Sequence, residues 1–202
     1  MVNVFKQIFN NKIYGIVRAD DAKRAVEIAN AYIEAGMKVI EMNCPTEAVK
    51  EVAKNSKVSV AVGGIITTQQ AQAAIDAGAK LLVSPILQMG LVKFTSWHKV
   101  PLMLTATTPN EAYSAWKARV PLIKIYPITD LGGSTYMEDL LRQMDFLNLM
   151  PTGSIEIKDI KEYLSNGASA IALGRQLYLG RKYEDILEIS KEAIAEAKEF
   201  IK

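Results

Sequence analysis

The chain has 202 residues, of which 50% are hydrophobic and 23% are charged, a composition typical of globular proteins. The net charge is only +2, and the basic residues are scattered rather than clustered, which argues against a nucleic-acid partner. The N-terminal residues lack the long apolar run of a secretory signal, and about 18 consecutive apolar residues occur nowhere in the sequence. We therefore expect a cytoplasmic protein without a membrane partner, folded as one domain over residues 1–202.

Cys44 is the only cysteine and His98 the only histidine. A single cysteine excludes an intrachain disulfide and a metal centre with several cysteine ligands. We therefore expect no metal and no cofactor. Cys44 has no neighbouring base in the sequence, and His98 lies in a mostly polar stretch, so neither indicates a nucleophile or a base.

The predicted elements alternate between aliphatic runs and amphipathic segments. Residues 2–9 predict a short helix that caps one end of the fold, and residues 183–202 predict an outer helix with Ile201 at its end. Between these, the aliphatic runs predict eight strands, at 13–17, 39–42, 58–62, 81–83, 102–104, 122–126, 147–150 and 170–173. The amphipathic segments predict helices at 21–35, 46–55, 68–77, 88–94, 109–118, 136–144 and 157–165.

Strands that alternate with helices form a parallel sheet. Eight such strands are the number that closes a (β/α)8 TIM barrel, which is the fold that we predict. A doubly wound open sheet is the alternative. Arg18 and the residues up to Asp21 follow the first strand, however, in place of the glycine-rich turn that binds dinucleotides in such sheets.

Two charged residues interrupt apolar strands, Glu41 within residues 39–42 and Lys124 within residues 122–126. A charge in the middle of a barrel strand is desolvated whether it points inward or outward. Burial disfavours the ammonium form of lysine, and the neutral amine is a nucleophile toward carbonyl groups. Glu41 would move the protons that such chemistry requires. A buried Lys–Glu ion pair without chemistry is the alternative.

Two glycine-containing turns follow the last two strands. Thr152, Gly153 and Ser154 come after strand seven, and Gly174 and Arg175 come after strand eight. Barrels often bind anions at these positions through backbone N–H groups, so we predict an anion site there; plain turns are the alternative.

Tyr126 lies on the same side of its strand as Lys124. It would either line the pocket of that lysine or pack in the core.

These residues resemble the 2-keto-3-deoxy-6-phosphogluconate / 4-hydroxy-2-oxoglutarate aldolase family, whose members are class I aldolases with a trimeric barrel. The most specific match is Lys124 with Tyr126 and Pro127, and the likeness extends over about residues 12–180. The resemblance implies that Lys124 forms a Schiff base and that Glu41 is the general acid/base. It also implies that Arg18 binds near the substrate carboxylate and that the chain forms a homotrimer.

The likeness also places Gly63 and Gly64 in the substrate pocket. Several pocket positions differ from the family pattern. Gly64 replaces a threonine of the family, and the other departures are Pro45, Thr105, Ser154 and Arg175.

The leading hypothesis is therefore an aldolase that acts on a 2-keto acid, with pyruvate as product, and on an aldehyde. The first alternative is a relative that has lost catalysis and binds an anionic metabolite or serves as an assembly subunit. The second is a barrel enzyme that acts on a phosphorylated sugar without a covalent intermediate. The altered pocket favours the alternatives, whereas the pair of Lys124 and Glu41 favours the aldolase.

Overall fold

The computed structural model describes residues 3–201; the parts of the predictions that concern Val2 and Lys202 lie outside them. The strands are β1 (Ile13–Arg18), β2 (Val39–Asn43), β3 (Ser59–Val62), β4 (Leu81–Ser84), β5 (Leu102–Ala106), β6 (Ile123–Ile125), β7 (Leu149–Pro151) and β8 (Ile171–Leu173). The α-helices are α1 (Val4–Asn11), α2 (Ala22–Ala35), α3 (Thr46–Ala53), α4 (Thr68–Asp76), α5 (Met89–His98), α6 (Pro109–Lys117), α7 (Gly133–Gln143), α8 (Ile160–Ser165), α9 (Arg175–Tyr178) and α10 (Tyr183–Glu196).

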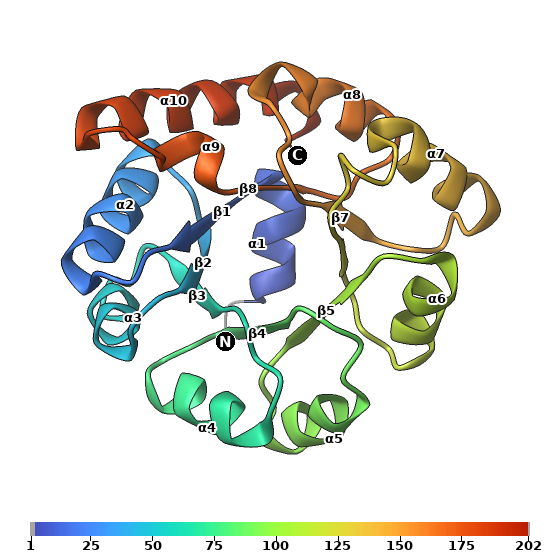
Figure 1. The fold of residues 1–202 in the computed structure, drawn as a ribbon, viewed down its shortest axis with the longest axis horizontal. Coiled ribbons are helices and arrows are strands. Elements are labelled where there is room, and N and C mark those ends of the chain that lie inside the picture. Colours follow the sequence, from blue (N-terminus) through green and yellow to red (C-terminus); the bar gives the residue numbers. More distant parts are fainter. Residues whose placement is uncertain (1–2, 202) are drawn as a thin grey trace.

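The eight strands pair in parallel in the order β7-β6-β5-β4-β3-β2-β1-β8. The two ends of this sheet meet, because Thr152 forms a parallel bridge with Ala172 and the Ser169 N–H donates to the Leu149 carbonyl at 2.8 Å. The strands thus form a nearly closed ring inside an outer ring of helices (Figure 1). The predicted parallel barrel is confirmed.

Side chains alternate between the barrel interior and the layer under the helices. On β2, Ile40 packs in the outer layer, whereas Val39 belongs to the interior cluster. Glu41 follows Ile40 and therefore points inward. The same alternation on β6 places Ile123 and Ile125 outward and Lys124 inward. A strand register shifted by one residue would reverse these directions, so the observed pairing decides where both charges point.

Helix α1 closes one end of the barrel. It lies across the centre of the ring (Figure 1), and its Val4, Phe5 and Ile8 side chains pack into the interior cluster. The Asn3 side chain caps this helix by accepting from the Phe5 N–H at 3.1 Å. Because α1 fills its end of the barrel with apolar side chains, polar residues can line only the opposite end, at which the strands finish.

A few predicted boundaries were wrong. Helix α5 continues to His98, where the left-handed Lys99 ends it. Strand β6 stops before Tyr126 because Pro127 has no N–H with which to extend the ladder. Helix α10 ends at Glu196 and a 3-10 turn (Lys198–Phe200) follows, so Ile201 lies beyond the predicted helix. The helix predicted at 157–165 is a 3-10 turn (Ile157–Asp159) followed by α8, and the sequence analysis did not predict α9.

Candidate functional site

Lys124 and Glu41 meet inside the barrel. They come from β6 and β2, which lie four strands apart and hence on opposite sides of the ring. The Lys124 Nζ lies 2.5 Å from the Glu41 Oε2, and the two residues are only 5% and 3% exposed. The pair is therefore desolvated, and one proton transfer within it gives a neutral amine beside a neutral carboxylic acid.

Two further side chains hold the Glu41 carboxylate. The Tyr14 hydroxyl donates to Oε2 at 3.0 Å, and the Asn43 Nδ2 donates to Oε1 at 3.0 Å. With Lys124, three donors fix the carboxylate, and such satisfaction is what a buried charge requires. The sequence analysis did not identify Tyr14 or Asn43. Asn43 could have been predicted from the two-residue period of a strand, since it follows Glu41 by two residues.

Gly63 provides the space for this arrangement. A Cβ at Gly63 would lie 2.4 Å from the Glu41 Oε1 and 2.1 Å from the Asn43 Oδ1. Position 63 therefore needs glycine for space. The next residue, Gly64, has a φ of +76° and is exposed, so the position that carries a threonine in the family here adopts a backbone conformation that favours glycine.

Tyr14 remains a hydrogen-bond donor. It is fully buried, and this burial, followed by the negative charge of Glu41, raises the pKa of the Tyr14 phenol well above its usual range. The Lys124 Nζ also lies 5.6 Å from the centroid of the Tyr14 ring, within the range of a cation–π contact. Tyr14 thus contacts both members of the buried pair.

Arg18 and Tyr126 lie at the mouth of the barrel. Arg18 ends β1 and is exposed, and its guanidinium makes no ion pair or hydrogen bond with residues 3–201. Its backbone is fixed by the Tyr178 hydroxyl, which donates to the Arg18 carbonyl at 3.0 Å. Tyr126 is 53% exposed and its ring lies 3.3 Å from the position of a Cβ on Gly153. Of its two predicted roles, packing in the core is therefore wrong.

The loops after β7 and β8 are joined by one side chain. The Gln176 Oε1 accepts from the Gly174 N–H at 3.0 Å, and its Nε2 donates to the Ile155 carbonyl at 2.9 Å. The Gly174 N–H, which the sequence analysis assigned to an anion, is therefore already used within the chain. Arg175 is exposed and its guanidinium has no partner in the described part of the chain.

The remaining loop positions are partly committed to the fold. Thr152 is buried and donates its hydroxyl to the Ala172 carbonyl at 3.3 Å, and the Gly153 carbonyl accepts from the Thr129 hydroxyl. Ser154 is left-handed, with a φ of +52°. Near Lys124, the Thr105 hydroxyl donates to the Ser84 carbonyl at 2.7 Å, so its proton is not free to bind a substrate.

Within residues 3–201, neither Cys44 nor His98 hydrogen-bonds to Lys124 or Glu41. Burial, and then the charge of Glu47, raises the pKa of the Cys44 thiol to about 11, so it is protonated at neutral pH. His98 is exposed on α5 and stacks on Phe94. Among residues 3–201, no group of three or more His, Cys, Asp or Glu could hold a metal ion.

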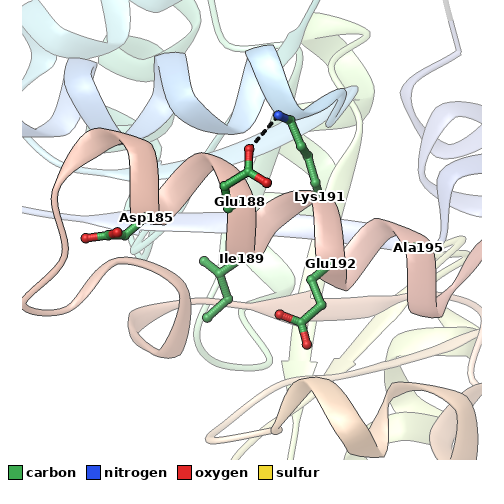
Figure 2. A pocket seen from close by; sticks show the side chains of 6 residues that line it. All are labelled: Asp185, Glu188, Ile189, Lys191, Glu192 and Ala195. Atoms are coloured by element: carbon green, nitrogen blue, oxygen red, sulfur yellow. Dashed lines mark hydrogen bonds and ion pairs between the residues drawn. The ribbon is translucent and has the colours of Figure 1, made fainter.

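One hollow lies away from the barrel interior. It follows the outer face of α10 and is lined by Asp185, Glu188, Lys191 and Glu192 among others (Figure 2). Its only lysine is paired with Glu188 at 2.7 Å. The hollow contains none of the predicted site residues. No helix within residues 3–201 is long and apolar enough to span a membrane.

Residues 4–191 match the family described as KDPG and KHG aldolase. The chain belongs to this family. A 2-dehydro-3-deoxy-phosphogluconate aldolase of Treponema pallidum is 27% identical over 171 residues, which are 82% of this chain and 81% of the relative. A KHG/KDPG aldolase of Escherichia coli is 25% identical over 187 residues, 87% of each chain. The prediction of an aldolase of this family is confirmed.

Solved structures agree on the fold. The 2-keto-3-deoxy-6-phospho-gluconate aldolase of Zymomonas mobilis superposes with a TM-score of 0.87 at 21% identity, covering 96% of this chain and 97% of that chain. The KDPG aldolase of Legionella pneumophila, solved with pyruvate captured as a covalent carbinolamine intermediate, gives a TM-score of 0.83 at 18% identity, covering 96% and 98%.

Proposed function

We propose that this barrel is a class I aldolase in which Lys124 forms the Schiff base and Glu41 moves the protons. The observation that carries the proposal is the Lys124–Glu41 pair, which is buried inside the barrel with its reacting atoms 2.5 Å apart. Buried ion pairs contribute little to stability. Two opposite strands that deliver a nucleophile and a base to one point therefore favour chemistry over a structural role.

The first steps make the imine. Transfer of a proton from Nζ to Glu41 frees the amine, whose lone pair attacks the C2 keto carbon of a 2-keto acid. The proton that the attacking nitrogen loses passes to the keto oxygen to give a carbinolamine, and water leaves as Glu41 gives its proton to the hydroxyl. The product is an iminium between Nζ and C2, which withdraws electrons from the neighbouring carbon.

Cleavage then uses a 4-hydroxyl group of the substrate. Glu41 takes the proton of this hydroxyl, an aldehyde forms as the C3–C4 bond breaks, and the electron pair moves into the iminium to give an enamine. Protonation of C3 by Glu41 and attack of water on C2 release pyruvate and the free lysine. The synthetic direction runs through the same steps in reverse.

The surrounding residues support an acidic substrate. The unpaired guanidinium of Arg18 at the barrel mouth would bind the keto-acid carboxylate, Gly63 would leave room for the Glu41 carboxylate, and the exposed Gly64 would leave room for the substrate. Tyr126 would line the entrance. The names of the relatives suggest keto-deoxy phosphosugar acids as substrates. The Gly153 to Ser154 turn and Arg175 would hold the distal anionic end, with one N–H fewer than expected because of Gln176.

The finer aspects of the proposal follow from the same likeness. The chain would act as one catalytic domain in the cytoplasm and assemble as a homotrimer. Exposed apolar side chains after β3 and β4 and at the start of α5 support assembly, since Ile66, Ile86 and Met89 are 43%, 50% and 48% exposed.

Trapping with borohydride tests the chemistry. Incubation with pyruvate and borohydride should reduce the iminium and attach one pyruvate-derived group to the chain, which peptide mapping should locate at Lys124. Lys124→Met should abolish the adduct while the barrel still folds, because the apolar side chain removes the lysine's desolvation cost and Glu41 can take up a proton.

Lys80→Met is the matched control, because Lys80 is exposed at the start of a strand and should leave labelling unchanged. A label on another lysine, or no adduct with any 2-keto acid in the wild-type protein, would contradict the Schiff-base mechanism.

A further inference from the structure

Tyr14 contacts the reacting pair from a third strand, β1, which lies next to β2. Resting on the proposed function, we propose that Tyr14 is a positioning residue that holds the Glu41 carboxylate in place as a proton acceptor while Lys124 is covalently bound to substrate. Neither the family match nor the resemblance assigns this residue a role.

The proposal starts from a shared atom. The Lys124 Nζ and the Tyr14 hydroxyl both donate to the Glu41 Oε2, whereas Asn43 is the one donor to Oε1 among the described residues. In the free protein the ammonium group of Lys124 offers up to three N–H donors. Once Nζ is an iminium it keeps one N–H, and as a neutral imine it keeps none. The hold of Lys124 on Oε2 therefore weakens at the stage when Glu41 must act on the substrate.

Tyr14 is suited to keep this hold. Its hydroxyl is fully buried and has no other hydrogen-bond partner among the described residues. The raised pKa of the phenol keeps the hydroxyl protonated at every pH at which the protein would work. The donor thus persists through the reaction cycle, and a hydrogen bond to a charged acceptor is among the stronger ones in proteins.

Within residues 3–201, three side chains hydrogen-bond to the Glu41 carboxylate. Tyr14 from β1 and Lys124 from β6 are titratable, and Asn43 is a neutral donor. Removing the Tyr14 hydroxyl should therefore change the proton affinity of one group, Glu41, without altering the number of charges in the barrel. The ring of Tyr14 would remain beside Lys124 in a phenylalanine variant, so Tyr14→Phe isolates the hydroxyl.

Two measurements on the same variant separate positioning from structure. The extent of borohydride trapping with pyruvate at equilibrium reports imine formation, and exchange of the pyruvate methyl protons with deuterium from D2O reports proton transfer to and from C3. In Tyr14→Phe we expect trapping near the wild-type extent. The exchange rate should fall about 10-fold or more, as the loss of a hydrogen bond to a charged group implies.

The pH profile of exchange gives a second readout. Without the donor, the carboxylate of Glu41 is less favoured over the carboxylic acid, so the acidic limb should move to higher pH by about one unit. A 3-fluorotyrosine at position 14, which is a more acidic phenol and a stronger donor, should move the limb to lower pH.

Tyr32→Phe is the matched control. Tyr32 is equally buried, but its hydroxyl has no hydrogen-bond partner among residues 3–201 and so does not bind Glu41. This variant should keep the wild-type exchange rate and pH profile. An unchanged limb and rate in Tyr14→Phe, an equal change in Tyr32→Phe, or an equal loss of trapping and exchange in Tyr14→Phe would each overturn the role of Tyr14. If the wild-type protein forms no trapped adduct, the proposed function itself fails and this inference fails with it.

Discussion

At the scale of single residues, Gly63 controls where the Glu41 carboxylate can lie. Its missing side chain leaves room for the Glu41 Oε1 and the Asn43 amide, both of which a Cβ would approach to less than 2.5 Å. Contacts this short must be relieved by movement of the two side-chain ends, because real Cβ atoms essentially never come so close. A substitution at Gly63 would therefore act on Glu41 from a residue that takes no part in the chemistry.

We predict that Gly63→Ala lowers kcat by about 10²-fold with a small change in KM, because a displacement of about 1 Å at a reacting group can cost this much. Gly63 has no positive φ, so alanine adds no backbone strain and the melting temperature should change little. Steady-state kinetics and a thermal melt check both statements.

Gly90→Ala is the control for a glycine replacement as such, since Gly90 lies in α5 and a Cβ there would meet only the Gln88 side chain. It should keep the wild-type kcat. A Gly63→Ala variant that is fully active would show that Glu41 tolerates displacement.

At the scale of elements, the strand-end loops decide how the distal end of a substrate is held. The sequence indicated two glycine turns and Arg175, and the structure adds Gln176, whose amide joins the turns and takes the Gly174 N–H. The remaining positive charge is that of Arg175, which is free of ion pairs within the described residues. Anion binding here would therefore depend mainly on the arginine.

We predict that phosphate raises the melting temperature of the wild-type protein and that Arg175→Ala removes most of this effect. At a phosphate concentration 100 times Kd the stabilisation is about 2.7 kcal/mol, which corresponds to several degrees for a chain of this size. Thermal shift against phosphate concentration at constant ionic strength is the measurement.

Arg142→Ala should respond to phosphate as the wild-type protein does. Arg142 is an exposed arginine of α7 whose charge is already paired with Glu138 at 2.9 Å. An undiminished shift in Arg175→Ala would show that the anion site lies elsewhere or does not exist.

The elements also show which features could be predicted from sequence. The eight strands and most helices were predictable because their apolar residues repeat with the period of the structure that they form. Glu41 and Lys124 were recognisable because each interrupts an apolar strand, but these strands are apolar on both faces, so the inward direction of the two charges came from the structure. Tyr14 was not recognised because a tyrosine in an apolar strand fits a packed core equally well. Its contact with Glu41 depends on the register in which β1 and β2 pair, with Ile16 opposite Glu41. This register cannot be predicted from the sequence of either strand alone.

Gln176 escaped recognition for a related reason. Its hydrogen bonds join Gly174 with Ile155, which comes from the preceding loop, and such contacts have no local sequence signal. The departures from the family pattern at Gly64 and Arg175 were visible in the sequence, but their consequence depends on neighbouring side chains. The substrate preference is therefore harder to predict from the sequence than the type of reaction is.

At the scale of the whole molecule, the two ends of the barrel have different tasks. Helix α1 fills one end with apolar side chains, while the polar residues and the buried pair lie toward the other. The surface beside this second end carries exposed apolar residues. Ile66 and Met89 flank loops that touch each other, since the Gln88 Nε2 donates to the Ile66 carbonyl at 3.4 Å. A grouped patch of this kind is typical of a protein–protein interface.

We predict a homotrimer that is built on this patch of Ile66, Ile86 and Met89. Light scattering should give about three times the chain mass of 22.3 kDa. Ile86→Glu should shift the mass to that of single chains, because a charge buried in the interface without a partner is strongly unfavourable. Leu179→Glu is the control, since Leu179 is 67% exposed on the far side of the barrel, after α9. A single-chain mass for the wild-type protein would contradict the trimer, and a trimer in Ile86→Glu would place its interface on another surface.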